Sequence, residues 1–287
     1  MSTKAALKAA KAAIDAKKWD EAKEQASAVT EKDPQNYFAK LFLGRANDAL
    51  GKFEDAAKAY NDATAIKPDD AQAWLGLRGL YEKQGPAKVD ENIHVGVKLA
   101  EIYMNLDDAH RSQSAIDKLV DHARRHGTKT QYARALTTQL PDSPVYSYLE
   151  GRLPNPSATY TRIADIHEEE EAQVIKKQIA ERRTRIGATQ EGTTIQVKNE
   201  VYGQSPLEGI YESIINWTSD DELRREYEEK LLQRAYDTLL VLPAGKKEEK
   251  RDKVMKLAHD MVIIKHPFFL AWQIELEWRS GLEVEAY

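Results

Sequence analysis

The feature that most constrains this chain is a repeat of about 34 residues, most complete between Tyr37 and Asp70. Within it, Gly51 separates two segments whose apolar residues recur at helical spacing, and Pro68 follows the second segment. Such a unit is a helix–turn–helix pair that cannot bury its own apolar face. Neighbouring units must therefore stack on it, and the chain is expected to be an all-α solenoid.

The stretch before Tyr37 repeats the pattern, because Ala22 lies 34 residues before Ala56 and Pro34 lies 34 residues before Pro68. A period of about 34 residues is typical of the tetratricopeptide repeat. We therefore predict a tetratricopeptide-repeat helical solenoid with about three units in residues 1–105. The small Gly44 is expected to let antiparallel helices approach closely.

Beyond these units the period is lost, although helical spacing continues. We predict an irregular helical segment at 106–156, ended by the sequence Leu153-Pro154-Asn155-Pro156. Longer helices are expected to continue the solenoid over 157–287, with a loop near 187–204 that contains a short extended piece at 193–197. Residues 266–278, HPFFLAWQIELEW, are typical of a first repeat helix with Trp272 and Trp278 in its core. We expect the chain to be an N-terminal fragment of a longer one.

Composition excludes several classes of protein. The absence of cysteine removes disulfides, zinc–thiolate sites and thiol catalysis, and favours an intracellular compartment. The net charge is −5, so no overall basic field attracts nucleic acid. No apolar run approaches the roughly 20 residues needed to cross a membrane. The sequence also lacks the GxGxxG, GxxxxGK[ST], HExxH and GxSxG motifs, so we expect neither an enzyme nor a cofactor.

A groove lined by the first helix of each repeat is the main candidate for a binding site. Position five of each unit is a leucine, and basic residues lie beside this stripe. Such a surface suits an extended peptide or a partner helix with apolar anchors and acidic flanks. The alternative is that later helices of the chain cover it. The predicted lining residues are Lys4, Leu7, Lys11, Ile14, Phe38, Leu41, Arg45, Asp48, Gln72, Leu75, Gly79 and Glu82.

The best-known ligand of such a groove is the acidic C-terminus of a chaperone, held by a clamp of lysine, asparagine and arginine side chains. The corresponding places here hold Leu7, Lys11, Phe42, Gln72 and Gly76. Because only Lys11 has a suitable charge, the sequence disfavours a chaperone adaptor.

Two basic clusters indicate an alternative function as an RNA-binding helical module. Neither contains aromatic residues on which bases stack, so a charged helix face is the preferred interpretation. The spacing of His122 and His126 allows two imidazoles to meet one metal ion, but no third ligand is evident, and surface histidines are preferred. The clusters are Arg124, Arg125, His126, Lys129 and Arg134, and Lys176, Lys177, Arg182, Arg183 and Arg185.

The segments EKDPQNYFAKLFLGRA, AIKPDDAQAWLGL and HDMVIIKHPFFLAWQIELEW, in this order, resemble the N-terminal arm of the tetratricopeptide scaffold subunit of the Ski (superkiller) complex. The resemblance implies a non-catalytic scaffold in a cytoplasmic assembly that supports helicase-driven 3′-to-5′ decay of messenger RNA by the exosome. Its implied partners are an RNA helicase, β-propeller subunits and an exosome-linking adaptor. It implies no membrane association and no direct contact with nucleic acid.

Overall fold

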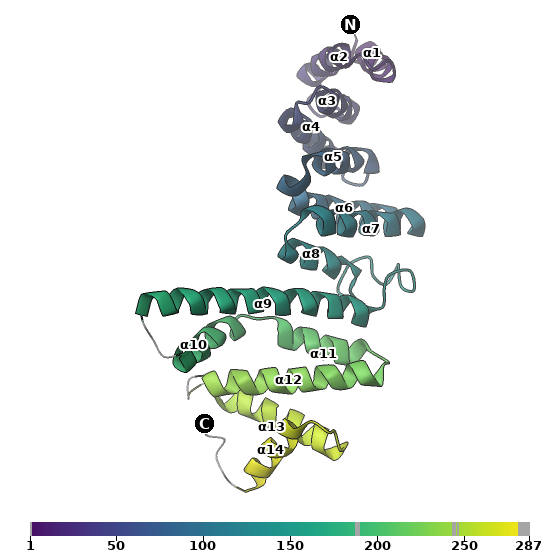
Figure 1. Cartoon of the computed structure of the whole chain (residues 1–287). Coiled ribbons are helices and arrows are strands. Elements are labelled where there is room, and N and C mark those ends of the chain that lie inside the picture. Colours follow the sequence, from purple (N-terminus) through teal and green to yellow (C-terminus); the bar gives the residue numbers. More distant parts are fainter. Residues whose placement is uncertain (1, 187–189, 243–244, 246, 281–287) are drawn as a thin grey trace. The chain divides into compact units, whose positions relative to one another are not determined.

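The computed structural model describes residues 2–186, 190–242, 245 and 247–280, and this part of the chain contains helices and turns but no strand. The chain divides into two compact units, Met1–Leu153 and Pro154–Tyr287 (Figure 1). The division falls at the proline-rich break Leu153-Pro154-Asn155-Pro156. No helix in the described residues is long and apolar enough to cross a membrane. The all-α solenoid predicted from the repeat is confirmed.

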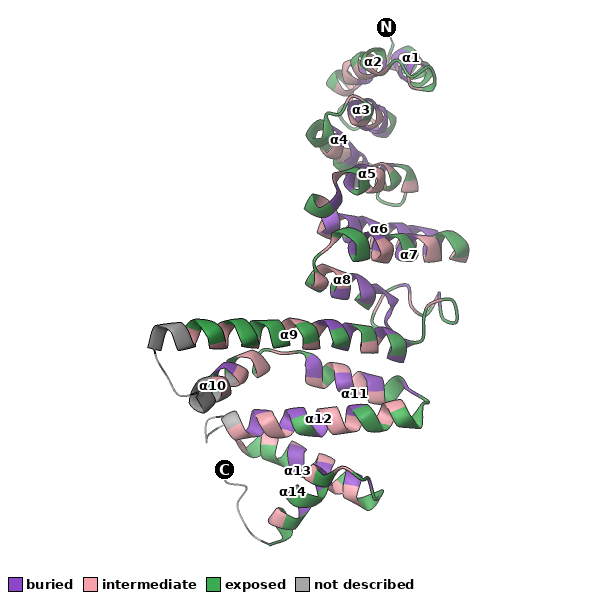
Figure 2. Ribbon diagram, viewed as in Figure 1, coloured by how far each residue is buried: buried purple, intermediate pink, exposed green. Residues whose placement is uncertain are grey.

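The first unit is a succession of helices in which each one packs on the next. Figure 2 shows their buried residues on the faces that meet neighbouring helices, with exposed residues on the outer faces. The elements are α1 (Thr3–Asp15), α2 (Trp19–Lys32), α3 (Tyr37–Ala49), α4 (Phe53–Ile66), α5 (Ala71–Gln84), the 3₁₀ turn η1 (Gly85–Lys88), α6 (Val89–Asn105), α7 (Ala109–His126), α8 (Lys129–Leu136) and the 3₁₀ turn η2 (Thr137–Gln139).

The 34-residue period reappears in the helix starts. Ser2, Asn36 and Asp70 are the N-caps of α1, α3 and α5, and each side-chain oxygen accepts a hydrogen bond from a backbone N–H in the first turn. These bonds satisfy donors that a helix start otherwise leaves unpaired. The predicted helix pairs therefore begin in the expected register.

The turn inside the first two repeats also recurs. Gly51 has a φ of 72°, and Lys17 takes the equivalent place in the first repeat with a φ of 57°. Gly85 of the third repeat, with a φ of 56° and a ψ of −126°, adopts a different conformation. In the first two repeats the N–H that follows the turn residue reaches back to a helix carbonyl, from Lys18 to Ala13 and from Lys52 to Asn47. This is the Schellman closure, which usually requires glycine at the left-handed residue. Lys17 makes it with a side chain present, as do Asp107 and Lys265, where the N–H groups of the following residues donate to the Tyr103 and Met261 carbonyls.

Close approach of α3, α4 and α5 depends on two glycines and one ring. Gly44 of α3 and Gly76 of α5 both lie against the buried ring of Tyr60 from α4. A Cβ added at Gly44 would stand 2.6 Å from Cδ1 of that ring, closer than real contacts allow. The expected role of Gly44 in close packing is thus confirmed, and Gly76 shares it.

The second unit begins with a long helix on which the following helices pack. The longer helices predicted from residue 157 onward are present, and the first of them starts one residue earlier, at Pro156. The elements are α9 (Pro156–Ile186), α10 (Gln190–Tyr202), α11 (Leu207–Trp217), α12 (Asp221–Val241), α13 (Lys247–Ile263) and α14 (Phe269–Arg279).

The loop expected at 187–204 is wrong for most of its length. Residues 187–189 lie outside the described residues, but 190–202 form the helix α10, and the extended piece at 193–197 is also helical. Gly192, Thr193 and Thr194 are poor helix formers, which is why the sequence favours a loop. Packing outweighs that preference, because α10 contacts α9 and α12 and Val197 is fully buried.

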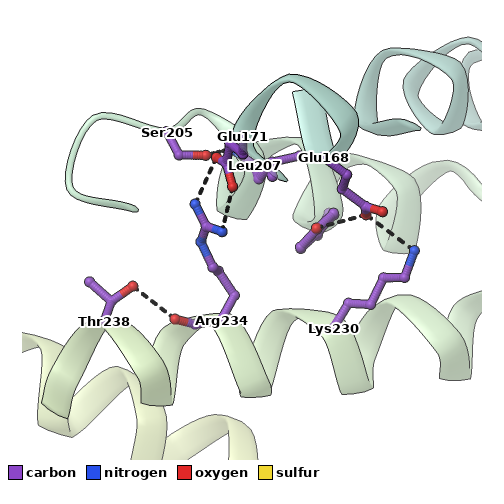
Figure 3. A network of polar contacts seen from close by, with 8 residues as sticks. Glu168, Glu171, Ser205, Leu207, Lys230, Arg234 and Thr238 are labelled. Atoms are coloured by element: carbon purple, nitrogen blue, oxygen red, sulfur yellow. Dashed lines mark hydrogen bonds and ion pairs between the residues drawn. The ribbon is translucent and has the colours of Figure 1, made fainter. Parts of the chain in front are cut away.

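A network of buried polar contacts joins α9 to the later helices of the second unit (Figure 3). The Arg234 guanidinium forms a two-pronged ion pair with Glu171, at 2.7 and 2.8 Å, and lies 3.5 Å from the centre of the Tyr202 ring. Glu168 accepts hydrogen bonds from the Tyr211 hydroxyl at 2.8 Å and from the Lys230 amine at 3.1 Å. Charge-assisted hydrogen bonds thus join α9, α11 and α12, and the contact of Arg234 with the Tyr202 ring adds α10.

The last helix, α14, repeats a detail of α5. The indole N–H of Trp272 donates to the His266 carbonyl at 2.7 Å, as that of Trp74 donates to the Pro68 carbonyl at 2.8 Å. In both, the acceptor lies six residues before the tryptophan. The expectation that Trp272 and Trp278 fill the core is wrong, because their exposed fractions are 43% and 51%. Their neighbours Ala271 and Ile274 are the residues that face inward.

Candidate protein-interaction groove

An open apolar groove with basic edges runs along α1, α3 and the start of α5. Its volume is about 590 Å³. The floor is apolar and includes Phe38, whose exposed fraction is 46%. The described residues that line it come from α1, α3 and α5. It is lined by Lys4, Leu7, Lys8, Lys11, Ile14, Asp15, Phe38, Phe42, Arg45 and Gln72.

The lining side chains of α1 follow one helical stripe. Lys4, Leu7, Lys11 and Ile14 recur at three- and four-residue intervals, which places them on one face. The opposite stripe is small and fully buried, formed by Ala6, Ala10 and Ala13 against α2 and α3. The alanines let α1 approach its neighbours closely, and the larger side chains then stand over the groove.

On α3 the predicted Phe38 and Arg45 line the groove, but the predicted Leu41 does not. Leu41 is 1% exposed and packs with Tyr37 and Tyr60 in the core of the first unit. Phe38, Phe42 and Arg45 form the stripe that lines the groove instead. Tyr37 and Leu41 are four residues apart, as are Phe38 and Phe42, so helical spacing alone fits either face. Phe42 is a lining residue that the sequence analysis missed.

On α5 the structure brings only Gln72 into the groove, where its side-chain oxygen accepts a hydrogen bond from Arg45 at 3.2 Å. Leu75 is 37% exposed but does not line the groove, so the leucines at position five do not form a continuous stripe. Asp48 and Glu82 are also outside it and form ion pairs, with Lys83 at 2.8 Å and Arg78 at 3.6 Å. Gly79 is not a lining residue either.

The groove has a basic edge. Lys4, Lys8 and Lys11 form no ion pair with any described residue, and Asp15 is the one carboxylate among the described lining side chains. Lys8, four residues after Lys4, is a second residue that the position-by-position prediction missed. Unpaired cations around an apolar floor favour an acidic partner with apolar anchors.

The geometry gives no support to a chaperone clamp. Leu7 and Phe42, which stand where the clamp needs polar side chains, contribute to the apolar floor. Gly76 lies against Tyr60, and no added side chain fits there. The groove therefore lacks the polar ring that would hold a terminal carboxylate.

The two basic clusters are neutralised in part by the chain's own acids. Arg124 and Arg125 both pair with Asp121, Arg134 pairs with Asp90 at 3.1 Å, and Arg182 pairs with Glu200 at 2.6 Å. Lys129 also has a partner within the chain. The side chains of Arg183 and Arg185 lie outside the described residues. Each pairing reduces the charge that these surfaces offer to a phosphate.

Of the two histidines, His126 is exposed as expected, whereas His122 is buried, contrary to expectation. The two rings lie 4.8 Å apart between centres, but His122 is 6% exposed and its Nε2 has no hydrogen-bond partner. Burial, and then the neighbouring His126, lower the pKa of His122. No group of three metal-binding side chains occurs in the described residues. The geometry therefore makes His122 a buried neutral residue.

Comparison with known proteins identifies the repeats and their relatives. Models of the tetratricopeptide repeat match residues 7–85 and 141–228. The first range is the part where the period is visible in the sequence. The second includes α9, α11 and part of α12, so repeat character extends into helices whose register the sequence does not reveal.

Relatives of the whole chain are found in fungi. Superkiller protein 3 of Schizosaccharomyces pombe is 32% identical over 286 residues, which cover 99% of this chain and 20% of that protein. Superkiller protein 3 of Saccharomyces cerevisiae is 26% identical, over 95% of this chain and 20% of that protein. The human superkiller complex protein 3 is 35% identical over 105 residues, 36% of this chain and 7% of that protein. The chain thus spans about a fifth of the length of its fungal relatives, and the resemblance to the superkiller scaffold is confirmed.

Proposed function

The chain belongs to the superkiller protein 3 family of tetratricopeptide-repeat proteins, and on that premise we propose that it is a non-catalytic protein-interaction arm of a superkiller complex. In this proposal the arm supports helicase-driven 3′-to-5′ decay of messenger RNA by the cytoplasmic exosome. Its partners are the helicase, the β-propeller subunits or the adaptor that links the complex to the exosome. The arm supplies binding surfaces and no chemistry.

The single observation that carries the proposal is the open groove of α1, α3 and α5. It combines exposed Phe38 with the unpaired amines of Lys4, Lys8 and Lys11. An exposed aromatic side chain beside free charges is typical of a protein-binding surface, since the ring supplies buried area and the charges orient the partner. We infer that the groove holds an acidic partner segment with apolar anchors.

The repeat framework explains how such a groove keeps its shape. The caps at Ser2, Asn36 and Asp70 fix the starts of the groove helices, and the Tyr60 ring between Gly44 and Gly76 fixes the packing of α3, α4 and α5. A preformed surface loses little conformational entropy when a partner binds. Less of the binding free energy is then used to order the groove, and more of it stabilises the complex.

The proposal is tested by capturing the helicase subunit on the immobilised chain, with and without nuclease. We expect capture to survive nuclease treatment, because the contact is between proteins. Capture that disappears with nuclease would favour the alternative, an RNA-binding module acting through the basic clusters at 124–134 and 176–185. In that case charge reversal at Arg124 and Arg125 would also abolish binding of an oligonucleotide.

Groove variants then locate the contact. Phe38→Ser removes a ring that is 46% exposed in the groove, whereas Phe53→Ser removes one that is 40% exposed outside it. Lys11→Glu reverses a charge at the groove edge, and Lys58→Glu reverses an exposed charge on α4. We expect the groove variants to reduce capture about tenfold, a loss of about 1.4 kcal/mol, and their controls to leave it unchanged. Equal effects of the two phenylalanine variants would refute this location.

A further inference from the structure

The second unit contains another groove, with charges opposite to those of the first. It has a volume of about 440 Å³ and lies between α11 and α13, with α12 at its base. The side chains that line it are Glu212, Ile215 and Asn216 from α11, Glu228 and Leu231 from α12, and Leu257, Asp260, Met261 and Ile264 from α13 and the residue after it.

The base of this groove is apolar and firmly packed. Leu231 and Met261 are 3% and 4% exposed. Ile264 stands at the edge with an exposed fraction of 63%. A buried base next to an exposed aliphatic side chain gives a partner something apolar to cover, and covering it removes Ile264 from water.

The spacing of α11 and α13 is set by ion pairs at one end of the groove. Glu208 of α11 binds both Lys250 and Lys253 of α13, and Glu212 binds Lys253 at 2.7 Å. These contacts lower the pKa of the partly buried Glu208 and keep it ionised. The ion pairs thus link α11 to α13 beside the groove, which Glu212 also lines.

The polar edge of the groove is acidic. It includes Glu212, Glu228 and Asp260, and no lysine or arginine is among the described side chains that line it. Glu212 is compensated by Lys253, and Glu228 lies 3.9 Å from Nε2 of the buried His266. Asp260 forms no ion pair with a described residue. The negative edge repels phosphates, so nucleic acid and anionic membranes are unsuitable occupants.

We propose that this acidic groove docks a basic amphipathic helix of a protein partner. Leu257 and Met261 of α13 and Ile264 directly after it form a ridge at intervals of four and three residues, the geometry into which side chains of another helix pack. Apolar side chains of the partner cover this ridge, while its lysines or arginines face Asp260 and Glu228. The inference stands independently of the N-terminal groove.

The test uses the full chain and two labelled helix-forming peptides of about 15 residues, long enough to form a helix. Both carry the same leucine stripe, one flanked by arginine and the other by glutamate, and binding is followed by fluorescence anisotropy. We expect the arginine peptide to bind more tightly, and the difference to shrink as salt rises from about 0.1 to 0.5 M.

Two groove variants are compared with matched controls in the same part of the chain. Asp260→Lys and Ile264→Ser alter the groove, whereas Asp252→Lys and Ile263→Ser alter exposed positions of α13 that do not line it. We expect each groove variant to lower the affinity for the arginine peptide about five- to tenfold and each control to leave this affinity unchanged. Because all four positions are exposed, circular dichroism should show the same fold in each variant.

Three outcomes would overturn the proposal. The first is equal binding, or no binding, of the two peptides. The second is that Asp260→Lys and Ile264→Ser do not weaken binding of the arginine peptide. The third is self-association of the chain that Ile264→Ser abolishes, because the occupant would then be a second copy. Phe38→Ser should not affect binding of the arginine peptide, so a failure here is distinguishable from a failure of the N-terminal groove.

Discussion

Lys17 and Gly51 occupy the same left-handed turn position of successive repeats, with φ values of 57° and 72°. The backbone bonds around them are also equivalent, since Lys17 N–H donates to the Ile14 carbonyl and Gly51 N–H to the Asp48 carbonyl. Glycine adopts this conformation freely, whereas a residue with a Cβ is strained in it. The packing of the two helices in the repeat therefore determines the turn geometry, whether the turn residue is lysine or glycine.

This relationship predicts that Lys17→Gly stabilises the chain. Relief of strain in the folded state exceeds the added entropy of glycine in the unfolded state, so we expect a gain of about 0.5–1 kcal/mol. The midpoint of urea unfolding measures it. Lys18→Gly, at a residue with a φ of −89°, is the matched control and should give no gain. A lower midpoint for Lys17→Gly would contradict the strain argument.

The packing of Tyr60 predicts opposite effects for two glycines of α5. Gly76→Ala drives a methyl group into the ring and should cost about 1–3 kcal/mol. A Cβ at Gly79 meets nothing within 4 Å, so Gly79→Ala should gain up to about 1 kcal/mol from helix propensity. Thermal unfolding compares the two. Equal shifts would mean that contact with Tyr60 does not limit the approach of α5.

The Arg234–Glu171 pair predicts a large loss on removal of one partner. Both side chains are mostly buried, at 10% and 14% exposure, so Arg234→Met leaves an uncompensated carboxylate. We expect a cost of about 3 kcal/mol, in part recovered when Glu171→Gln is added. Arg225→Ala, exposed on the same helix, should change stability by less than about 0.5 kcal/mol. A double variant no more stable than Arg234→Met would rule out a coupled pair.

The burial of His122 predicts that the stability of the folded chain depends on pH. Burial lowers its pKa in the folded chain, whereas the unfolded chain takes up a proton near the ordinary value of about 6.5. Between these two pKa values the unfolded state binds more protons than the folded state. The stability that neutral His122 contributes is therefore fully present above about pH 6.5 and is lost as the pH falls toward the folded pKa. Its surroundings are His126, Arg125, Glu82 and the Gly85 backbone.

The measurement is the unfolding midpoint between pH 7.5 and 5.5. We expect His122→Gln to show a smaller decrease than the parent chain, because it removes one of the groups that titrate on unfolding. His110→Gln, at an exposed position of the same helix, should retain the full decrease. Identical pH profiles for the two variants would show that His122 does not contribute.

The parts of the structure that could be predicted from the sequence depend on residues whose effect is local. Gly51 marks a left-handed turn, and Pro68 marks a helix end, so the first two helix pairs follow from spacing. The position of Leu41 could not be predicted in this way, because it and Phe38 both obey helical periodicity. Which of them faces the core depends on the Tyr60 ring, which belongs to another helix.

The same limit applies to α10 and to the second groove. Gly192 and Thr193 favour a loop locally, and only contact with α9 and α12 makes them helical. The acids of the second groove come from three helices, and Glu228 and Asp260 are 32 positions apart in the sequence. No spacing rule brings them together without the packing of α11, α12 and α13.

The contact of Tyr60 with Gly44 and Gly76 also determines whether repeats can be exchanged. Caps and turns are in phase from one repeat to the next, so removing one whole period would preserve every helix boundary around the junction. The side chains would not match, because the residue equivalent to Tyr60 in the preceding repeat is Ala26. Ala26 would then stand between Gly76 and Ala10, the residue equivalent to Gly44, and would leave an empty space where the ring lies. The repeats therefore have equivalent helix boundaries, but the packing of Tyr60 between Gly44 and Gly76 prevents one repeat from replacing another without a packing defect.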